Sequence, residues 1–196
     1  MKKTVVIFLI FCLVFSLSGC ASDGSSSSTS TASSVSGNTA AGFYYNSLEN
    51  IMGGATTYYD WEYALIVVGR IAEEPFSVRE AGDVRMVEVD QTIYGEPQEE
   101  VALLQMYDFQ LDTSRTYLLI LVTTGPEDKI YTVAGAGEQA AFWIEDGELC
   151  GNSADLVKEI QNDTAAGTNT INGETPDINT MEGLADYFAA RVAALG

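Results

Sequence analysis

The chain reads YALIVVGRI over residues 63–71 and TYLLILVTT over residues 116–124. A continuous apolar run of this length, bounded by turn residues, is typical of a strand buried on both faces. Alternating apolar residues at 84–94 and 101–107, and a shorter run at 130–134, add further strands separated by Gly- and Pro-containing turns. We therefore expect a mainly β domain built around the two long apolar runs.

A hairpin is expected where Asp146-Gly147 separates residues 141–145 from residues 148–150. Asp-Gly between two apolar segments is the strongest short-range hairpin signal, since both turn positions need a positive φ. Five to seven short strands with few intervening helices favour a small antiparallel OB-like barrel.

Helices are expected on either side of the strands. Residues 47–52 predict a short N-terminal helix with Ser47 as its N-cap, and residues 153–161 predict another, followed by a polar loop over 162–179. Residues 181–195 predict a C-terminal amphipathic helix, with Asn179 and Glu182 as a capping box. Its apolar positions are Met181, Leu184, Ala185, Phe188, Val192 and Leu195. We expect this face to pack on the domain's own sheet, with a partner-binding face as the alternative.

The N-terminus has the organisation of an export signal. Two lysines precede an apolar run over residues 4–16, which is shorter than the roughly 20 residues of a membrane-spanning helix. The motif Leu17-Ser18-Gly19-Cys20 follows, and it closely resembles the lipobox of bacterial lipoproteins. The resemblance implies cleavage after Gly19, lipid attached to the Cys20 sulfur, and a lipid-anchored protein on the extracytoplasmic face of the cell membrane.

Three segments follow from this interpretation: a signal peptide over 1–19, the lipidated Cys20 with a Ser/Thr-rich flexible tether over 20–42, and a barrel domain over 43–196. Removing the signal leaves 7 basic against 28 acidic side chains, a formal charge of -21. An anionic lipid surface repels such a domain, so the lipid must do the anchoring. Cys12 is lost with the signal and Cys20 is modified, so Cys150 has no intrachain disulfide partner and is expected to be a small apolar strand residue.

The strand pattern resembles uncharacterised lipoproteins and secreted proteins of Gram-positive bacteria. The similar segments are residues 47–49, 64–69, 115–121 and 135–149, with Ile120 where those proteins usually have an aromatic residue. The resemblance covers about residues 47–150. It implies an OB-like module reminiscent of netrin or metalloproteinase-inhibitor domains, and it implies a fold and a location without an activity.

Composition excludes several function classes. With 28 acidic against 9 basic residues and a charge of -19, the chain lacks the basic face that nucleic-acid binding needs. The absence of His removes the commonest general base and zinc ligand, so we do not expect an enzyme. The motif G-x-G-x-x-A at 135–140 matches a dinucleotide fingerprint, but strand residues follow it instead of a helix, so we expect a glycine-bent barrel corner and no cofactor.

Acidic pairs leave two alternatives open. They lie at Asp60/Glu62, Glu73/Glu74, Glu96/Glu99/Glu100, Glu127/Asp128 and Glu145/Asp146. Such loops could bind Ca²⁺, although none matches a calcium-loop motif, which leaves a Ca²⁺-dependent envelope structural protein as one alternative. A pair of carboxylates could also serve a small hydrolase.

Aromatic residues cluster before the first strand, at Tyr58, Tyr59, Trp61 and Tyr63. If exposed they are candidate binding anchors. We favour burial for them, and for Tyr94 and Tyr107 at the ends of the next two strands, because aromatics also dominate cores. The leading hypothesis is a membrane-anchored, non-catalytic binding module for a protein or cell-envelope ligand.

Overall fold

The computed structural model describes residues 47–49, 51–52, 64–80, 82–123, 129–135 and 138–194. The chain divides into two compact units, residues 1–39 and 40–196, and every described residue belongs to the second. The following description concerns that unit alone.

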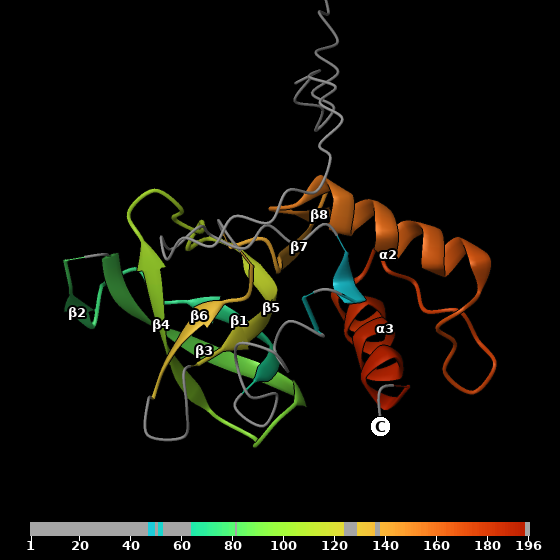
Figure 1. The fold of residues 1–196 in the computed structure, drawn as a ribbon, viewed down its shortest axis with the longest axis horizontal. Helices are drawn as coiled ribbons and strands as arrows, with labels where there is room; N and C mark the ends of the chain where they lie inside the picture. Colours follow the sequence, from blue (N-terminus) through green and yellow to red (C-terminus); the bar gives the residue numbers. More distant parts are fainter. Residues whose placement is uncertain are drawn as a thin grey trace, which may run out of the picture. The chain divides into compact units, whose positions relative to one another are not determined.

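Five strands close into a barrel in the order β1-β3-β4-β6-β5, and β5 pairs back onto β1 (Figure 1). They are β1 (Leu65–Ile71), β3 (Gly82–Tyr94), β4 (Glu100–Met106), β5 (Thr116–Val122) and β6 (Ile130–Val133). The mainly β, OB-like barrel is thus confirmed. One pair departs from the antiparallel expectation: β6 is antiparallel to β5 but parallel to β4, since it fills the place between them.

The two long apolar runs form neighbouring strands of the barrel. β1 and β5 pair in an antiparallel register that places Val67 opposite Leu119, and both residues are fully buried. β1 also pairs with β3, and Gly69 permits this close approach, because a Cβ there would lie 2.4 Å from the Glu88 carbonyl oxygen. The prediction of two strands buried on both faces is confirmed.

Three strands lie outside the barrel. β7 (Ala141–Glu145) and β8 (Glu148–Gly151) form the expected hairpin, and Asp146 and Gly147 adopt φ values of 53° and 76° at its turn. β7 extends the sheet by pairing with β5. The short β2 (Ser77–Val78), which the sequence pattern did not predict, pairs with the start of β3.

The helix α2 (Ala154–Ala166) ends five residues later than predicted. Ser153 caps its start by accepting a hydrogen bond from the Leu156 N–H, and Gly167 ends it at a φ of 66°. Residues 162–166 are therefore helical and not part of the expected polar loop. Tertiary contacts of Asp163 with the last helix hold this final turn.

The helix α3 (Met181–Ala193) packs on the domain's own sheet, as predicted. Phe188 is fully buried, with its ring centroid 5.5 Å from that of Phe142 on β7. The N-cap is Thr180, whose hydroxyl accepts from the Gly183 N–H, so the prediction of Asn179 was wrong by one residue. The predicted short helix before the barrel is also present, since residues 48–49 and 51–52 are helical.

Candidate functional site

Glu138 occupies a tight turn between β6 and β7. Its backbone has a φ of 56°, a left-handed value that glycine adopts more easily, and Gly135, three residues earlier, has a φ of 86°. Hydrogen bonds fix the turn: the Ala140 N–H donates to the Ala134 carbonyl at 3.1 Å, and the Glu138 carbonyl accepts from the Asn152 side chain at 2.9 Å. The positive φ values of Gly135 and Glu138 agree with the bend predicted in this region, whose residues 136 and 137 lie outside the described residues, and strand β7 follows.

The side chain of Glu138 is buried without a partner. Only 5% of the residue is exposed, and within the described residues neither carboxyl oxygen has a hydrogen-bond partner. Burial raises the pKa of this carboxyl to about 8. Interaction with the Met106 backbone N–H lowers the pKa slightly, but it does not complete a hydrogen bond of normal geometry. Glu138 is consequently mostly protonated at neutral pH.

A second buried polar side chain lies one residue before Met106. Gln105 is fully buried on β4, and both of its amide atoms lack hydrogen-bond partners among the residues that the structure describes. Alternation along the strand puts Gln105 on the same face as the buried Val101 and Leu103. An unpartnered amide at such a position costs stability, and cases of this kind in folded proteins call for an explanation.

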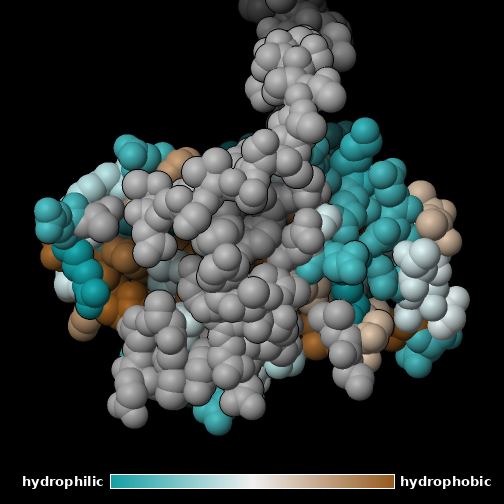
Figure 2. Space-filling model, in the orientation of Figure 1, coloured by the Kyte–Doolittle hydropathy of each residue, from teal (hydrophilic) through white to brown (hydrophobic). Residues whose placement is uncertain are grey.

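Large apolar side chains are exposed around the same end of β4. We call these five residues the apolar end: Phe76 (74% exposed), Val78 (68%), Met106 (48%), Tyr107 (51%) and Phe109 (44%). Strand pairing brings their segments to the same end of the barrel, because β2 pairs with the start of β3, and that start pairs with the end of β4. The register aligns Val78 with Asp83 and Gln105, and Met106 with Gly82, so Val78 and Met106 lie on alternate faces of these strands. Brown, hydrophobic surface is visible at the left edge of Figure 2, where Figure 1 places β2.

A hydrogen bond and a close contact between strands fix the conformation of the apolar end. The Tyr107 hydroxyl donates to the Arg79 carbonyl at 3.0 Å and links the turn after β4 to the turn after β2. Gly82 lies opposite Met106 in the β3–β4 pair, and a Cβ there would lie 1.9 Å from the Gln105 carbonyl oxygen. The close packing at this point therefore requires glycine.

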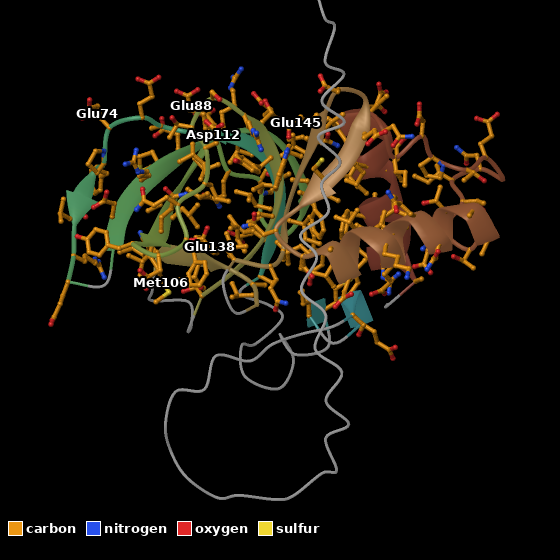
Figure 3. All side chains as sticks on the ribbon, turned by 90° about the horizontal axis from the view of Figure 1, so that it is seen from above. Glu74, Glu88, Met106, Asp112, Glu138 and Glu145 are labelled. Atoms are coloured by element: carbon orange, nitrogen blue, oxygen red, sulfur yellow. The ribbon has the colours of Figure 1, made fainter. Side chains whose placement is uncertain are left out.

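Glu138 adjoins the apolar end and is separate from the surface acids. In Figure 3, Glu138 and Met106 lie beside each other, which agrees with the interaction between the Met106 N–H and the carboxyl. The other labelled acids lie along the opposite edge of that view: Glu74, Glu88, Asp112 and Glu145. The site thus combines exposed apolar side chains with one buried, unpartnered carboxyl.

The polar side chains of α2 and α3 are satisfied by one another. Arg191 pairs with Glu159 at 2.9 Å and with Asp163, and the Tyr187 hydroxyl donates to Asp163 at 2.9 Å. Glu159 also accepts the Leu48 N–H at 2.6 Å, which ties the short first helix to α2. Burial raises the pKa of the Tyr187 hydroxyl. This network has a structural role, since each of its charges has an opposite partner.

Most of the site residues predicted from the sequence fall outside the described residues. These are the lipobox residues and the candidate binding aromatics: Leu17, Ser18, Gly19, Cys20, Tyr58, Tyr59, Trp61 and Tyr63. Tyr94 is half-buried, but the prediction of burial was wrong for Tyr107. Cys150 is a half-buried strand residue of β8, opposite Trp143.

Within the described ranges, no group of three or more acidic or cysteine side chains is arranged to hold a metal ion. In that same part of the chain, no helix combines the length and hydropathy that crossing a bilayer requires.

Sequence reasoning missed the residues that carry the site. One signal was available, since Gln105 stands at an inward position of the alternating strand 101–107, where an apolar residue is the rule. For Glu138 there was none, because its burial depends on how the turn folds over β4. No family model, curated protein or solved structure matches the chain, so its function must be argued from its own residues.

Proposed function

We propose that this protein is a membrane-anchored extracytoplasmic lipoprotein, and that its barrel domain is a non-catalytic binding module for a protein or cell-envelope ligand. The apolar end is its binding surface. The observation that carries this proposal is the grouping of five exposed large apolar residues beside the unpartnered Glu138. Large apolar side chains left exposed at one end of a domain are candidates for contact with a partner.

The proposed location rests on the lipobox Leu17-Ser18-Gly19-Cys20 and on the Ser/Thr-rich segment that follows it. Acyl chains on Cys20 hold the protein at the bilayer, and the tether lets the acidic domain stand away from the surface. Loss of palmitate labelling in a Cys20→Ser variant tests this part of the proposal, and continued labelling of that variant contradicts it.

A raised carboxyl pKa is also a property of catalytic acids, and a carboxylate-dependent hydrolase is the alternative function. A carboxylate-dependent hydrolase needs a second carboxylate within about 10 Å of the first. The causes of the Glu138 shift are burial and the Met106 backbone, and no charged side chain is among them. The observation therefore favours binding over hydrolysis.

The test compares three full-length proteins displayed on cells: the wild type, a Phe76→Ser/Phe109→Ser double variant, and a Gln161→Ser control. Gln161 is exposed on α2 and lies outside the apolar end. Cross-linking followed by purification should recover the same envelope component with the wild type and the control, and much less with the double variant. Equal recovery with all three proteins would contradict the proposed surface.

A further inference from the structure

Among the residues that the structure describes, no ion pair joins a cation to the carboxyl of Glu138. Four arginines of the described residues make ion pairs, and all pair with other acids: Arg70, Arg85, Arg115 and Arg191. Within the described part of the chain, no charged group is a cause of the Glu138 pKa shift, and the titratable group that interacts with this carboxyl is the Tyr117 hydroxyl on β5, whose own pKa Glu138 helps to raise. An isolated buried carboxyl costs free energy in either protonation state, because it finds no hydrogen-bond partner.

We propose that the apolar end binds a peptide segment in which a Lys or Arg side chain is flanked by apolar residues, and that this basic group pairs with Glu138. The inference rests on the function proposed above and names its ligand class. The exposed apolar side chains would contact the flanking residues, while the buried carboxyl would receive the cation. The net charge of -19 supports the choice of a basic partner, because the field of the whole chain attracts cations.

Met106 lies beside the Glu138 carboxyl, and its side chain is suited to move aside and admit a ligand. Met106 is about half exposed, and its unbranched thioether side chain moves at lower cost than a branched or aromatic one. Gln105, one residue earlier, has an unpartnered amide that can accept or donate at the same end of β4. Binding would therefore satisfy polar groups that the free protein leaves without partners.

Pairing of Glu138 with a basic group should release the proton of its carboxyl. The free carboxyl holds a proton at pH 7, since burial raises its pKa to about 8. A cation beside it favours the charged form, so the proton leaves to the buffer when the peptide binds. We expect the release of close to one proton per bound peptide at pH 7, roughly the fraction protonated before binding.

The experiment uses the full-length lipidated protein in zwitterionic nanodiscs, with empty nanodiscs as the reference titration. Two short probes differ only at the central position: acetyl-Leu-Lys-Leu-amide and the same peptide with norleucine in place of lysine. Calorimetry is run at pH 7 in phosphate and in Tris, whose ionisation enthalpies differ. The variants are Glu138→Gln and, as a control with the same side-chain substitution, Glu74→Gln, whose side chain is exposed and lies far from Glu138 in Figure 3.

We expect the lysine peptide to bind the wild type and Glu74→Gln about tenfold more tightly than the norleucine peptide, as a charged hydrogen bond predicts. Glu138→Gln should remove this preference, and the proton release should disappear with it. Equal binding of both peptides to the wild type, or lysine binding without proton release, overturns the inference. The wild-type proton release decides the matter even if Glu138→Gln fails to fold.

The two proposals fail in different ways. If both peptides bind equally and Phe76→Ser/Phe109→Ser weakens both, the apolar end is a binding surface and the assignment of a basic ligand is wrong. If neither peptide binds, the basic-peptide assignment is also overturned. The proposed function itself fails only when the double variant recovers its envelope component as well as the wild type does.

Discussion

The two sides of the domain differ in whether their buried polar groups have partners. On the helical side, formed by α2, α3 and the β7–β8 hairpin, Arg191 pairs with both Glu159 and Asp163, and aromatic rings pack against one another nearby. At the apolar end, Glu138 and Gln105 are buried without partners while large apolar side chains face solvent. The first arrangement stabilises the fold, and the second costs stability.

This contrast indicates where function lies. Selection for folding alone would place the apolar residues inside and the carboxyl outside, because both exchanges lower the free energy of the folded state. The opposite arrangement at one end of the barrel is the reason that we propose a ligand for the apolar end. The predictions below test the contrast, beginning with the largest expected effect.

Removing an aromatic ring should separate the two sides most clearly. Phe188→Ala empties a fully buried position on the helical side and should lower the free energy of unfolding by about 3–5 kcal/mol. Phe109→Ala changes a ring that is 44% exposed at the apolar end and should cost about 1 kcal/mol or less. Urea unfolding of the two variants measures the difference. Similar losses would contradict the assignment of the helical side as the stabilising one.

Arg191→Ala should break the ion network of the helical side. It leaves Glu159 and Asp163 without their cation in a partly buried setting, and the expected loss is about 3 kcal/mol. The matched control is Arg70→Ala, because Arg70 also pairs with two acids but is 56% exposed. That variant should lose less than about 1 kcal/mol. Equal thermal shifts for both variants would show that the network is not structural.

Glu138→Gln should stabilise the free protein in a pH-dependent way. The carboxyl pKa is near 4.5 when unfolded and about 8 when folded, so between these values the folded state holds a proton that the unfolded state has lost. Wild-type stability therefore falls as pH rises through this window. The variant should match the wild type below about pH 4.5 and exceed it by about 1–3 kcal/mol at pH 8. If the free energies of unfolding of the two proteins differ by the same amount at every pH in this range, the result contradicts a buried carboxyl.

The smallest predicted effect concerns the cap of α3. Thr180→Ala removes the hydroxyl that accepts from the Gly183 N–H and should cost about 1 kcal/mol. Asn179→Ala should change stability by less than about 0.5 kcal/mol, since the Asn179 side chain is not the cap. Thermal melts of the two variants measure these losses. A larger loss for Asn179→Ala than for Thr180→Ala would favour Asn179 as the N-cap.

The barrel was predictable because its strands follow simple rules. The runs at 63–71 and 116–124 have apolar residues at nearly every position, and Asp146-Gly147 has the chemistry of one hairpin turn. The extra turn of α2 was not predictable, because Asp163 and Thr164 are weak helix formers whose conformation depends on contacts with Arg191 and Ile160. The parallel pairing of β6 with β4 also results from closure of the barrel rather than from a local pattern.

The candidate site was less predictable than the fold. The residues of the apolar end come from segments around β2 and β4, and β2 is only two residues long. Glu138 is one of 28 acidic residues, and nothing in its immediate neighbours distinguishes it from the solvated ones. Its burial arises from the packing of a turn against another strand, and no local sequence pattern indicates such packing.

The protonation state of the Glu138 carboxyl can be observed directly by ¹³C NMR of the full-length protein labelled at glutamate. The Glu138 resonance, assigned by its absence from Glu138→Gln, should titrate with a midpoint near pH 8. Addition of the lysine peptide should shift that midpoint to lower pH. A midpoint near 4.5 in the free protein would show a solvated carboxyl and contradict the account.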